Sequence, residues 1–506
     1  MLPIDWAPEL PAPQPDQLVV LVVGKDDLDS VTQRFGAGVR GALEAAGFRG
    51  AAGDSFRFST TDGGFCQYLL LGVEALEGGT VRKLGFDAGK AARGAGVAKL
   101  VLDLRGKLGE LDASRSAKLI TEGLELSGYV YDRYFGEDKR KPSKLEAVTV
   151  VAEGEVTARR GAAKHGQLIA ESIRRARDLG NGPADLVTPT FLAEAASELA
   201  AELRGAEHDV TCTVLDLDEC ERLGMGLFTA VARGSEQPPK FIHMVYRPKS
   251  SSGLSSGQAS KGRVCLIGKG VTFDSGGYSL KPSDSMMHMK LDMSGAAAVI
   301  AAMYGIAKLE LPYEVHAIVA AAENMVSGKA YRLGDVFRAS NGKTVEINNT
   351  DAEGRLTLAD ALVYAAKLEP DLVIDFATLT GACVVALGPH ICGVMTRDDE
   401  LANRWLAAGE LAGEDMWRLP LPKALMSMLD SKIADMRNTG ERYGGALTAG
   451  LFLEQFAEGK RWMHVDIAGP AIVEKPFGVN TEGSSGIPVA TIIEFLSAGA
   501  ELRTPG

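Results

Sequence analysis

Two short motifs contain the residues whose types and spacing could do chemistry: GKGVTFDSGG at 268–277 and NTDAEGRL at 349–356. With the stretch that follows the first motif, they supply the charged residues Lys269, Asp274, Asp292, Asp351 and Glu353. Carboxylates at this density repel one another unless a cation neutralises them, and their hard oxygen atoms suit Mn, Mg, Co or Zn ions. The four carboxylates carry enough negative charge for two divalent ions.

The backbone around each motif predicts how these side chains meet. An apolar strand predicted at Val264–Ile267 would run into a glycine-rich loop, so that Lys269 and Asp274 emerge at the carboxyl end of a strand, where α/β sheets usually carry ligands. This position at the end of a strand favours a role in ligand binding or catalysis for both residues.

The second motif lies directly before an amphipathic helix. Asp351 and Glu353 are two residues apart, so an extended backbone would project both to one side, with Arg355 continuing the alternation. We expect these three charged side chains to converge.

Other catalytic motifs fit poorly. Lys269 lacks the lead-in of a phosphate-binding Walker loop, and the seven histidines show no HExxH spacing. The segment at 253–257 matches GxSxG, but both flanks are rich in Ser and Gly, whereas a nucleophile elbow needs a strand before it and a helix after it. Cys265 lies in an apolar strand and is expected to be a small core residue.

The elements that must position the motifs indicate two α/β domains, as expected for 506 residues. We predict a smaller N-terminal domain over 1–160 and a larger catalytic domain over 161–506, with a mostly parallel central sheet flanked by helices. The predicted strands are Leu18–Val23, Tyr68–Val73, Leu100–Leu104, Ala147–Ala152, Val264–Ile267, Val315–Ala320 and Leu372–Phe376. The predicted helices are Val156–Arg177, Pro189–Leu203 with Thr188 as N-cap, Gly295–Lys308 and Leu356–Leu368. A Ser- and Gly-rich loop is predicted at 250–262.

Composition narrows the function classes. The net charge of −12 disfavours general binding to nucleic acid, although Lys139, Arg140, Lys141 and Lys144 form one basic run. The N-terminal stretch lacks the basic and apolar regions of a secretory signal, and no apolar stretch approaches the ~18 residues of a membrane span. Six scattered cysteines without a CxxC pair indicate a reducing compartment. We expect a cytoplasmic protein without membrane partners.

At these motifs the chain resembles the leucyl aminopeptidase family, the cytosol aminopeptidases that act as dinuclear-metal exopeptidases. Its hallmark NTDAEGRL is intact, and GKGVTFDSGG is followed by SLKP at 279–282 and KxDMxGAAAV at 290–299. Weaker similarity extends over nearly all of 180–490. The N-terminal third is similar to the family only in its type of domain, because the family has a variable α/β domain there.

The resemblance implies roles for individual residues. One metal would bind Lys269, as a neutral amine, with Asp274, Asp292 and Glu353, and the other would bind Asp274, Asp351 and Glu353. Lys281 would stabilise the oxyanion, and Arg355 would hold a bicarbonate ion that shuttles the proton. The pocket for the N-terminal side chain would comprise Met289, Thr378, Gly381, Ala468 and Ala471, which are small or apolar and fit an aliphatic residue such as Leu or Met.

The resemblance further implies Mn²⁺ or Zn²⁺ as cofactors, with Mg²⁺ or Co²⁺ as alternatives, peptides with a free N-terminus as substrates, and a homohexamer. Two other functions stay open. Some relatives combine peptidase activity with DNA binding, which the acidic balance disfavours here. A dinuclear phosphoesterase would need several Arg or Lys side chains for its phosphate, and the pocket of Met and Ala fits a peptide better.

Overall fold

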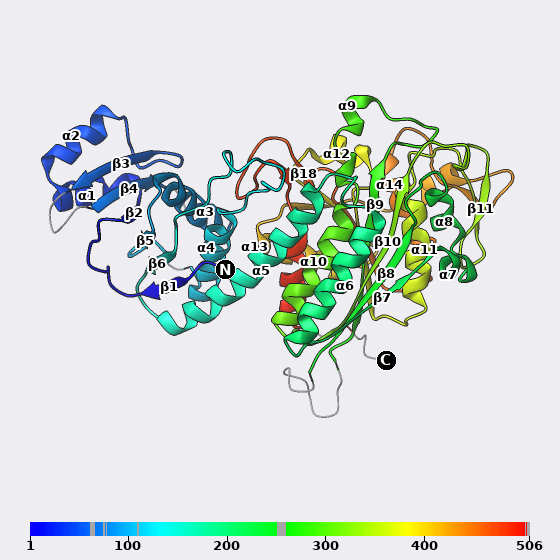
Figure 1. Cartoon of the computed structure of the whole chain (residues 1–506), viewed down its shortest axis with the longest axis horizontal. Coiled ribbons are helices and arrows are strands. Elements are labelled where there is room, and N and C mark those ends of the chain that lie inside the picture. The colour runs from blue at the N-terminus through cyan, green and yellow to red at the C-terminus, as the bar shows by residue number, and fades with distance from the viewer. Residues whose placement is uncertain are drawn as a thin grey trace. The chain divides into compact units, whose positions relative to one another are not determined.

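The computed structural model describes residues 1–60, 66–73, 76, 78–108, 111–249, 260–500 and 502. The chain divides into two compact units, Met1–Glu171 and Ser172–Gly506. The division falls inside helix α5 (Val156–Asn181), a long helix that Figure 1 shows in cyan. Each unit contains its own sheet, so the prediction of two α/β domains is confirmed.

The N-terminal unit is built on a six-stranded sheet with the order β1-β6-β5-β2-β4-β3. All neighbouring pairs are parallel except β3 and β4. Its strands are β1 (Ile4–Ala7), β2 (Gln17–Val23), β3 (Ser55–Thr60), β4 (Cys66–Gly72), β5 (Lys99–Asp103) and β6 (Ala147–Val151). Its helices before α5 are α1 (Leu28–Phe35), α2 (Ala37–Ala45), α3 (Gly78–Ala95) and α4 (Ala113–Leu126). Strand β2 is buried along its whole length, because helices cover both of its faces.

The second unit is built on an eight-stranded mixed sheet with the order β15-β14-β17-β13-β9-β10-β8-β7. The central strands β17, β13, β9 and β10 are mutually parallel, whereas β8, β7 and β14 join in antiparallel fashion. The strands are β7 (Asp209–Leu215), β8 (Lys240–Arg247), β9 (Arg263–Asp274), β10 (Glu314–Asn324), β13 (Leu372–Ala377), β14 (Cys392–Met395), β15 (Met416–Arg418) and β17 (Trp462–Asp466). This arrangement confirms the predicted mostly parallel core.

Helices cover both faces of this sheet (Figure 1). Cys265 and Ile267 of β9 lie in one buried cluster with α8, α11 and α14, so Cys265 is a core residue, and burial raises the pKa of its thiol to about 12. Helix α10 packs on β9 and β13 outside that cluster. The helices are α6 (Pro189–Gly205), α7 (Leu217–Arg222), α8 (Gly226–Ala232), α9 (Ser283–Met286), α10 (Ser294–Lys308), α11 (Gly354–Ala366), α12 (Gly381–Leu387), α13 (Asp399–Ala412), α14 (Gly445–Glu454) and α15 (Val489–Ser497).

Smaller sheets border the central one. Strands β11 (Val336–Arg338), β12 (Thr344–Glu346) and β16 (Met436–Arg437) form a three-stranded sheet, and β18 (Ile472–Val473) pairs with β19 (Gly483–Ser484). Within the described residues, no helix is both long and apolar enough to cross a membrane. The GxSxG segment at 253–257 and most of the loop predicted at 250–262 lie outside those residues.

The sequence prediction was wrong about the end of the central strand. β9 does not stop at Ile267 but continues to Asp274, so Lys269 lies within the strand and not in a loop. The glycines that indicated a loop are required by close packing instead. A Cβ at Gly268 would lie 2.4 Å from the carbonyl oxygen of Gly295, and a Cβ at Gly295 would lie 2.1 Å from that of Phe376. Three backbones therefore approach closely where α10 begins.

The other predicted elements are confirmed with shifts of a few residues at their ends. The helix predicted from Pro189 begins there, and the Thr188 hydroxyl accepts a hydrogen bond from the amide of Phe191, as expected of an N-cap. Two ends shift by four residues: α5 continues beyond Arg177 to Asn181, and β10 continues beyond Ala320 to Asn324. The extension of β10 matters because it keeps β10 paired with β9 as far as Asp274.

Candidate active site and metal centre

The site begins where β9 and β10 end side by side. Asp274 is the last residue of β9, and its register partner in β10 is Asn324. The amide nitrogen Nδ2 of Asn324 donates to Oδ1 of Asp274 at 2.8 Å and to the carbonyl oxygen of Thr350 at 2.9 Å. Asn324 therefore joins the first motif to the second, although the two are far apart in sequence.

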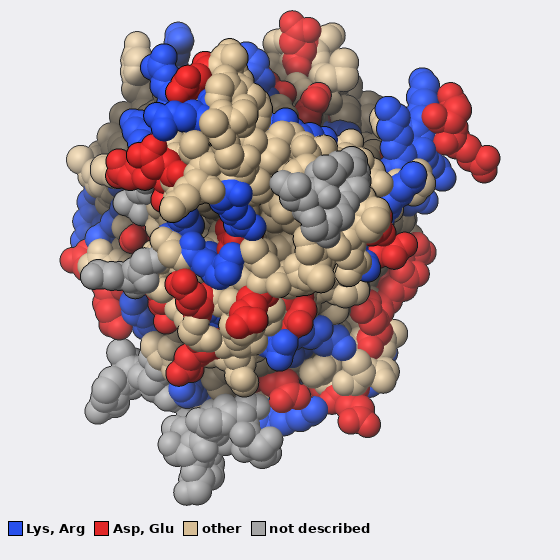
Figure 2. Space-filling model, turned by 90° about the vertical axis from the view of Figure 1, so that its left-hand side faces the viewer, with Lys and Arg blue, Asp and Glu red and all other residues tan. Residues whose placement is uncertain are grey.

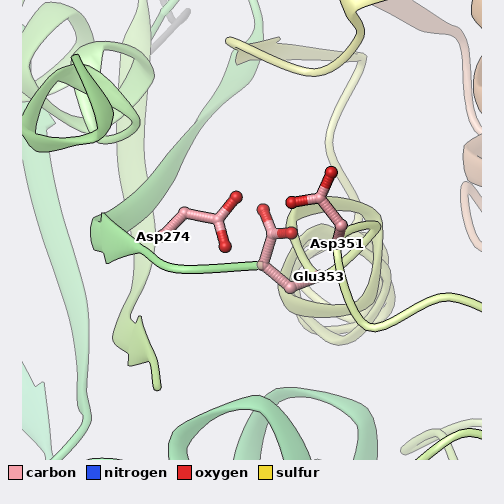
Figure 3. Close-up of side chains that lie close together, drawn as sticks. All are labelled: Asp274, Asp351 and Glu353. Carbon is pink, nitrogen blue, oxygen red and sulfur yellow. The ribbon is translucent and has the colours of Figure 1, made fainter. Parts of the chain in front are cut away.

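The second motif turns into helix α11 and is not extended, so the predicted alternation of Asp351, Glu353 and Arg355 is wrong. Asp351 lies in a turn, and Glu353 is the N-cap of α11 with helical dihedral angles, φ −75° and ψ −36°. The convergence is nevertheless real for two of these residues, because the turn aims both carboxylates at Asp274. Figure 3 shows the three carboxylates pointing toward one another, with one ligand oxygen of each within 4.8 Å of the others.

Lys269 reaches this cluster from inside β9. Its Nζ lies 2.7 Å from Oδ1 of Asp292 and 2.8 Å from Oε1 of Glu353, and it donates to the carbonyl oxygen of Thr378 at 3.1 Å. Gly354 permits this approach, since a Cβ there would lie 2.4 Å from Cε of the lysine. Asp292 follows the short 3-10 helix Met289–Leu291.

Lys281 approaches the same cluster from the loop after β9. Its Nζ lies 2.9 Å from Oδ2 of Asp274 and 2.5 Å from Oδ1 of Asp351. Each lysine thus bridges a different pair of carboxylates. The predicted metal ligands and Lys281 all belong to one cluster.

The two lysines do not fully neutralise the four carboxylates of the cluster. Burial and the Glu353 carboxylate raise the pKa of Asp274 to about 6, and burial raises the pKa of Asp292 well above its ordinary value. Among the described residues, Oδ2 of Asp292 and Oε2 of Glu353 are buried without a hydrogen-bond partner. Buried carboxylate oxygens without partners are costly, and divalent cations would satisfy them. The donor set of the site therefore fits metal ions.

The side chains around Lys269, which is predicted to be a neutral ligand, oppose the loss of its proton. Burial lowers the pKa of Lys269, but the charges of Asp292, Glu353 and Asp274 outweigh burial and raise it above its ordinary value. Loss of the proton therefore requires cations of higher charge next to the amine.

The residues of the cluster line a cavity of about 830 Å³. Four of the five residues predicted for the side-chain pocket line this cavity: Met289, Thr378, Gly381 and Ala468. The fifth, Ala471, is buried and is not among the lining residues. Arg355, in the first turn of α11, also lines the cavity and donates from Nη1 to the carbonyl oxygen of Asn438 at 2.8 Å.

Two polar residues that hold the site, Asn324 and Asp466, were not predicted, and a third, Thr378, has a contact that was not expected. Thr378, expected only as a pocket residue, donates from Oγ1 to Oδ1 of Asp292 at 2.7 Å. Asp466, at the end of β17, accepts from the amides of Leu379 and Ala468 at 3.2 and 3.1 Å, and both of these residues line the cavity. Asn324 and Asp466 both end parallel strands beside β9 or β13, which is the signal that could have found them.

Comparisons with known proteins agree over both units. Residues 174–493 match the catalytic domain of the cytosol aminopeptidase family, and residues 19–136 match its N-terminal domain. The chain is 41% identical over 476 residues to a probable cytosol aminopeptidase of Picosynechococcus sp., covering 93% of both chains. It is 49% identical over 356 residues to one of Gloeobacter violaceus, covering 70% of this chain and 68% of that protein.

Two solved structures are similar over nearly the whole length. A mutant of tomato leucine aminopeptidase aligns with a TM-score of 0.88 and 32% identity over 98% of this chain and 96% of that one. The bottromycin maturation enzyme BotP in complex with Mn aligns with a TM-score of 0.82 and 37% identity over 96% and 99%. The chain belongs to the cytosol aminopeptidase family, and its activity is that of a leucyl aminopeptidase, a metal-dependent exopeptidase.

Proposed function

We propose that this aminopeptidase uses two divalent metal ions per subunit, held by the cluster at the ends of β9 and β10. The observation that carries the proposal is the approach of ligand oxygens of Asp274, Asp351 and Glu353 to within 4.8 Å of one another. Lys269 and Asp292 would complete one metal site, and Asp274 and Glu353 would be shared by both. Manganese or zinc fits this donor set, and the Mn complex of a similar protein favours manganese.

The ions would supply Lewis-acid polarisation of the scissile carbonyl and a water of lowered pKa. Lys281 would stabilise the negative charge that develops on the carbonyl oxygen. It is suited to this task because Asp274 and Glu353 outweigh the effect of burial and raise its pKa, so that it stays a cation. A requirement for the free α-amino group of the substrate would make the reaction exo-acting.

Arg355 would hold a bicarbonate ion that carries the proton from the water. The guanidinium is buried and lines the cavity, and in the described part of the chain its Nε has no hydrogen-bond partner. Burial lowers its pKa to about 10, so it remains a cation at neutral pH and cannot itself act as a base. A buried cation with an unused donor is suited to a small anion.

The N-terminal side chain would bind against Met289, Thr378, Gly381 and Ala468. Small and apolar walls favour Leu or Met over charged residues. Ala471 would act from behind this wall, since it is buried and its carbonyl oxygen accepts from the amide of Ser485 at 3.2 Å.

The test is hydrolysis of leucine p-nitroanilide after chelation and readdition of manganese or zinc. We expect activity to disappear with the chelator and return with the metal. An N-acetylated substrate should not be cleaved, because its blocked amine cannot bind a metal. Activity that survives complete metal removal, or equal cleavage of the acetylated substrate, would refute the two-metal proposal.

We further propose that the N-terminal domain, predicted over 1–160, serves assembly and access control in a homohexamer. Deletion of 1–160 should leave a chain that sedimentation shows to be smaller than a hexamer. A truncated chain that still forms hexamers would exclude this role.

The charges on the surface give no support to DNA binding on the face drawn in Figure 2. Acidic and basic side chains are interspersed there, whereas a nucleic-acid surface gathers basic side chains on one face.

A further inference from the structure

The last turn of α5 contacts two separate segments that line the substrate cavity. Asn181, the last residue of α5, opens the turn-rich segment at 181–190, which the catalytic site does not otherwise use. Its carbonyl oxygen accepts from Nζ of Lys290 at 2.9 Å, and its side-chain Oδ1 accepts from the amide of Ser484 at 2.8 Å. One residue thereby binds two segments that are far apart in sequence.

The first of these segments contains both a pocket residue and a metal ligand. Lys290 lies in the 3-10 helix Met289–Leu291, between the pocket residue Met289 and Leu291, and Asp292 follows directly. Its bond to Asn181 therefore anchors the backbone that positions Met289 and Asp292.

The second segment pairs with a strand that lines the cavity. Ser484 lies in β19, where it pairs with Ile472 of β18, and Gly483 pairs with Val473. Both Ile472 and Val473 line the cavity. Ser484 thus pairs directly with a strand that lines the cavity, and the hydrogen bond from its amide to Asn181 fixes its position.

Two glycines show that this junction is built for close approach. A Cβ at Gly180 would lie 2.4 Å from Oγ of Ser484, and one at Gly483 would lie 2.2 Å from Oδ1 of Asn181. Gly483 also has a φ of +106°, which disfavours any other residue. Nearby, Nε of the buried Arg177 donates to the carbonyl oxygen of Ser485 at 2.8 Å and holds the same segment to α5.

We propose that Asn181 is a positioning residue for substrate binding. Its hydrogen bonds to Lys290 and Ser484 set the distance between the lining at Met289 and the lining at Ile472 and Val473. Its side chain acts on the second segment, whereas its backbone acts on the first.

The test is Asn181→Leu, whose side chain has the same number of heavy atoms, branched at the same carbon, but no acceptor for the Ser484 amide. We expect KM for leucine p-nitroanilide and leucyl dipeptides to rise about tenfold, the equivalent of one hydrogen bond, with kcat and metal content little changed. Asn181→Asp, which retains the oxygen acceptor, should restore a KM near that of the wild type.

Arg175→Gln is the matched control on the same helix, because Arg175 pairs with Glu202, at 2.9 Å for each of two nitrogen–oxygen contacts. Its KM should stay that of the wild type. If Asn181→Leu does not fold, Asn181→Ala carries the same comparison. A lowered Tm with an unchanged KM, or an Asp variant as impaired as the Leu variant, would overturn the proposal.

Discussion

Replacing Glu353 with Gln should reduce kcat/KM by more than the about 10–100-fold that mutation of residues supporting metal ligands typically costs. Glu353 lies at the centre of the cluster, since Oε1 pairs with Lys269 and Oε2 has no partner among the described residues. Burial raises its pKa, but Lys269 and Lys281 outweigh burial and lower it to about 2. The substitution therefore removes a full negative charge at any pH near neutral while keeping the shape of the side chain.

Metal analysis after dialysis distinguishes the cause of this loss. If Glu353 bridges two ions, the variant should retain fewer than two metals per subunit, and excess manganese should restore activity only partly. The fold should survive, because Lys269 keeps its contact with Asp292. Glu346→Gln is a suitable control, since that carboxylate accepts from Ser431 outside the cavity. Full metal content and full activity in Glu353→Gln would exclude Glu353 as a ligand.

Local sequence patterns predicted part of the fold, but not the features that depend on contacts between separate elements. Apolar runs and helical periodicity predicted β10, β13, α6, α10 and α11 to within a few residues, whereas the central strand β17 was not predicted. The end of β9 was missed because Gly268 and Gly270 are typical of loops when only local sequence is considered. Their actual cause is the approach of Gly295 and Val319, which belong to other elements and are therefore invisible to local patterns.

The candidate site shows the same limit. Carboxylate density in two motifs was sufficient to predict that Asp274, Asp351 and Glu353 meet, but the extended backbone assumed for the last two was wrong. Their convergence depends on a turn and on the start of α11, which the charge pattern alone does not specify. Asn324 was missed because an amide side chain in an apolar strand does not indicate a functional role by itself. Its role follows only from the strand register, which places it opposite Asp274.

Replacing Lys281 with Met should reduce kcat by about 10²–10³-fold, the usual cost of removing one group that stabilises a transition-state oxyanion. The change removes a cation that lies 2.9 Å from Asp274 and lines the cavity. KM should change little, because an interaction made only in the transition state does not contribute to substrate binding. Steady-state kinetics on leucine p-nitroanilide with saturating manganese would measure both constants.

The contacts of Lys281 also permit a different role, in which its charge only offsets the repulsion between Asp274 and Asp351. The two roles predict opposite results. A purely compensating cation competes with metal for the same carboxylates, so Lys281→Met would bind metal at least as tightly and keep its kcat once the metal is saturating. An oxyanion-stabilising cation cannot be replaced by more metal, so the loss of kcat should persist at every manganese concentration. Lys281→Arg, which retains the charge on a longer and broader group, should recover part of kcat only in the second case.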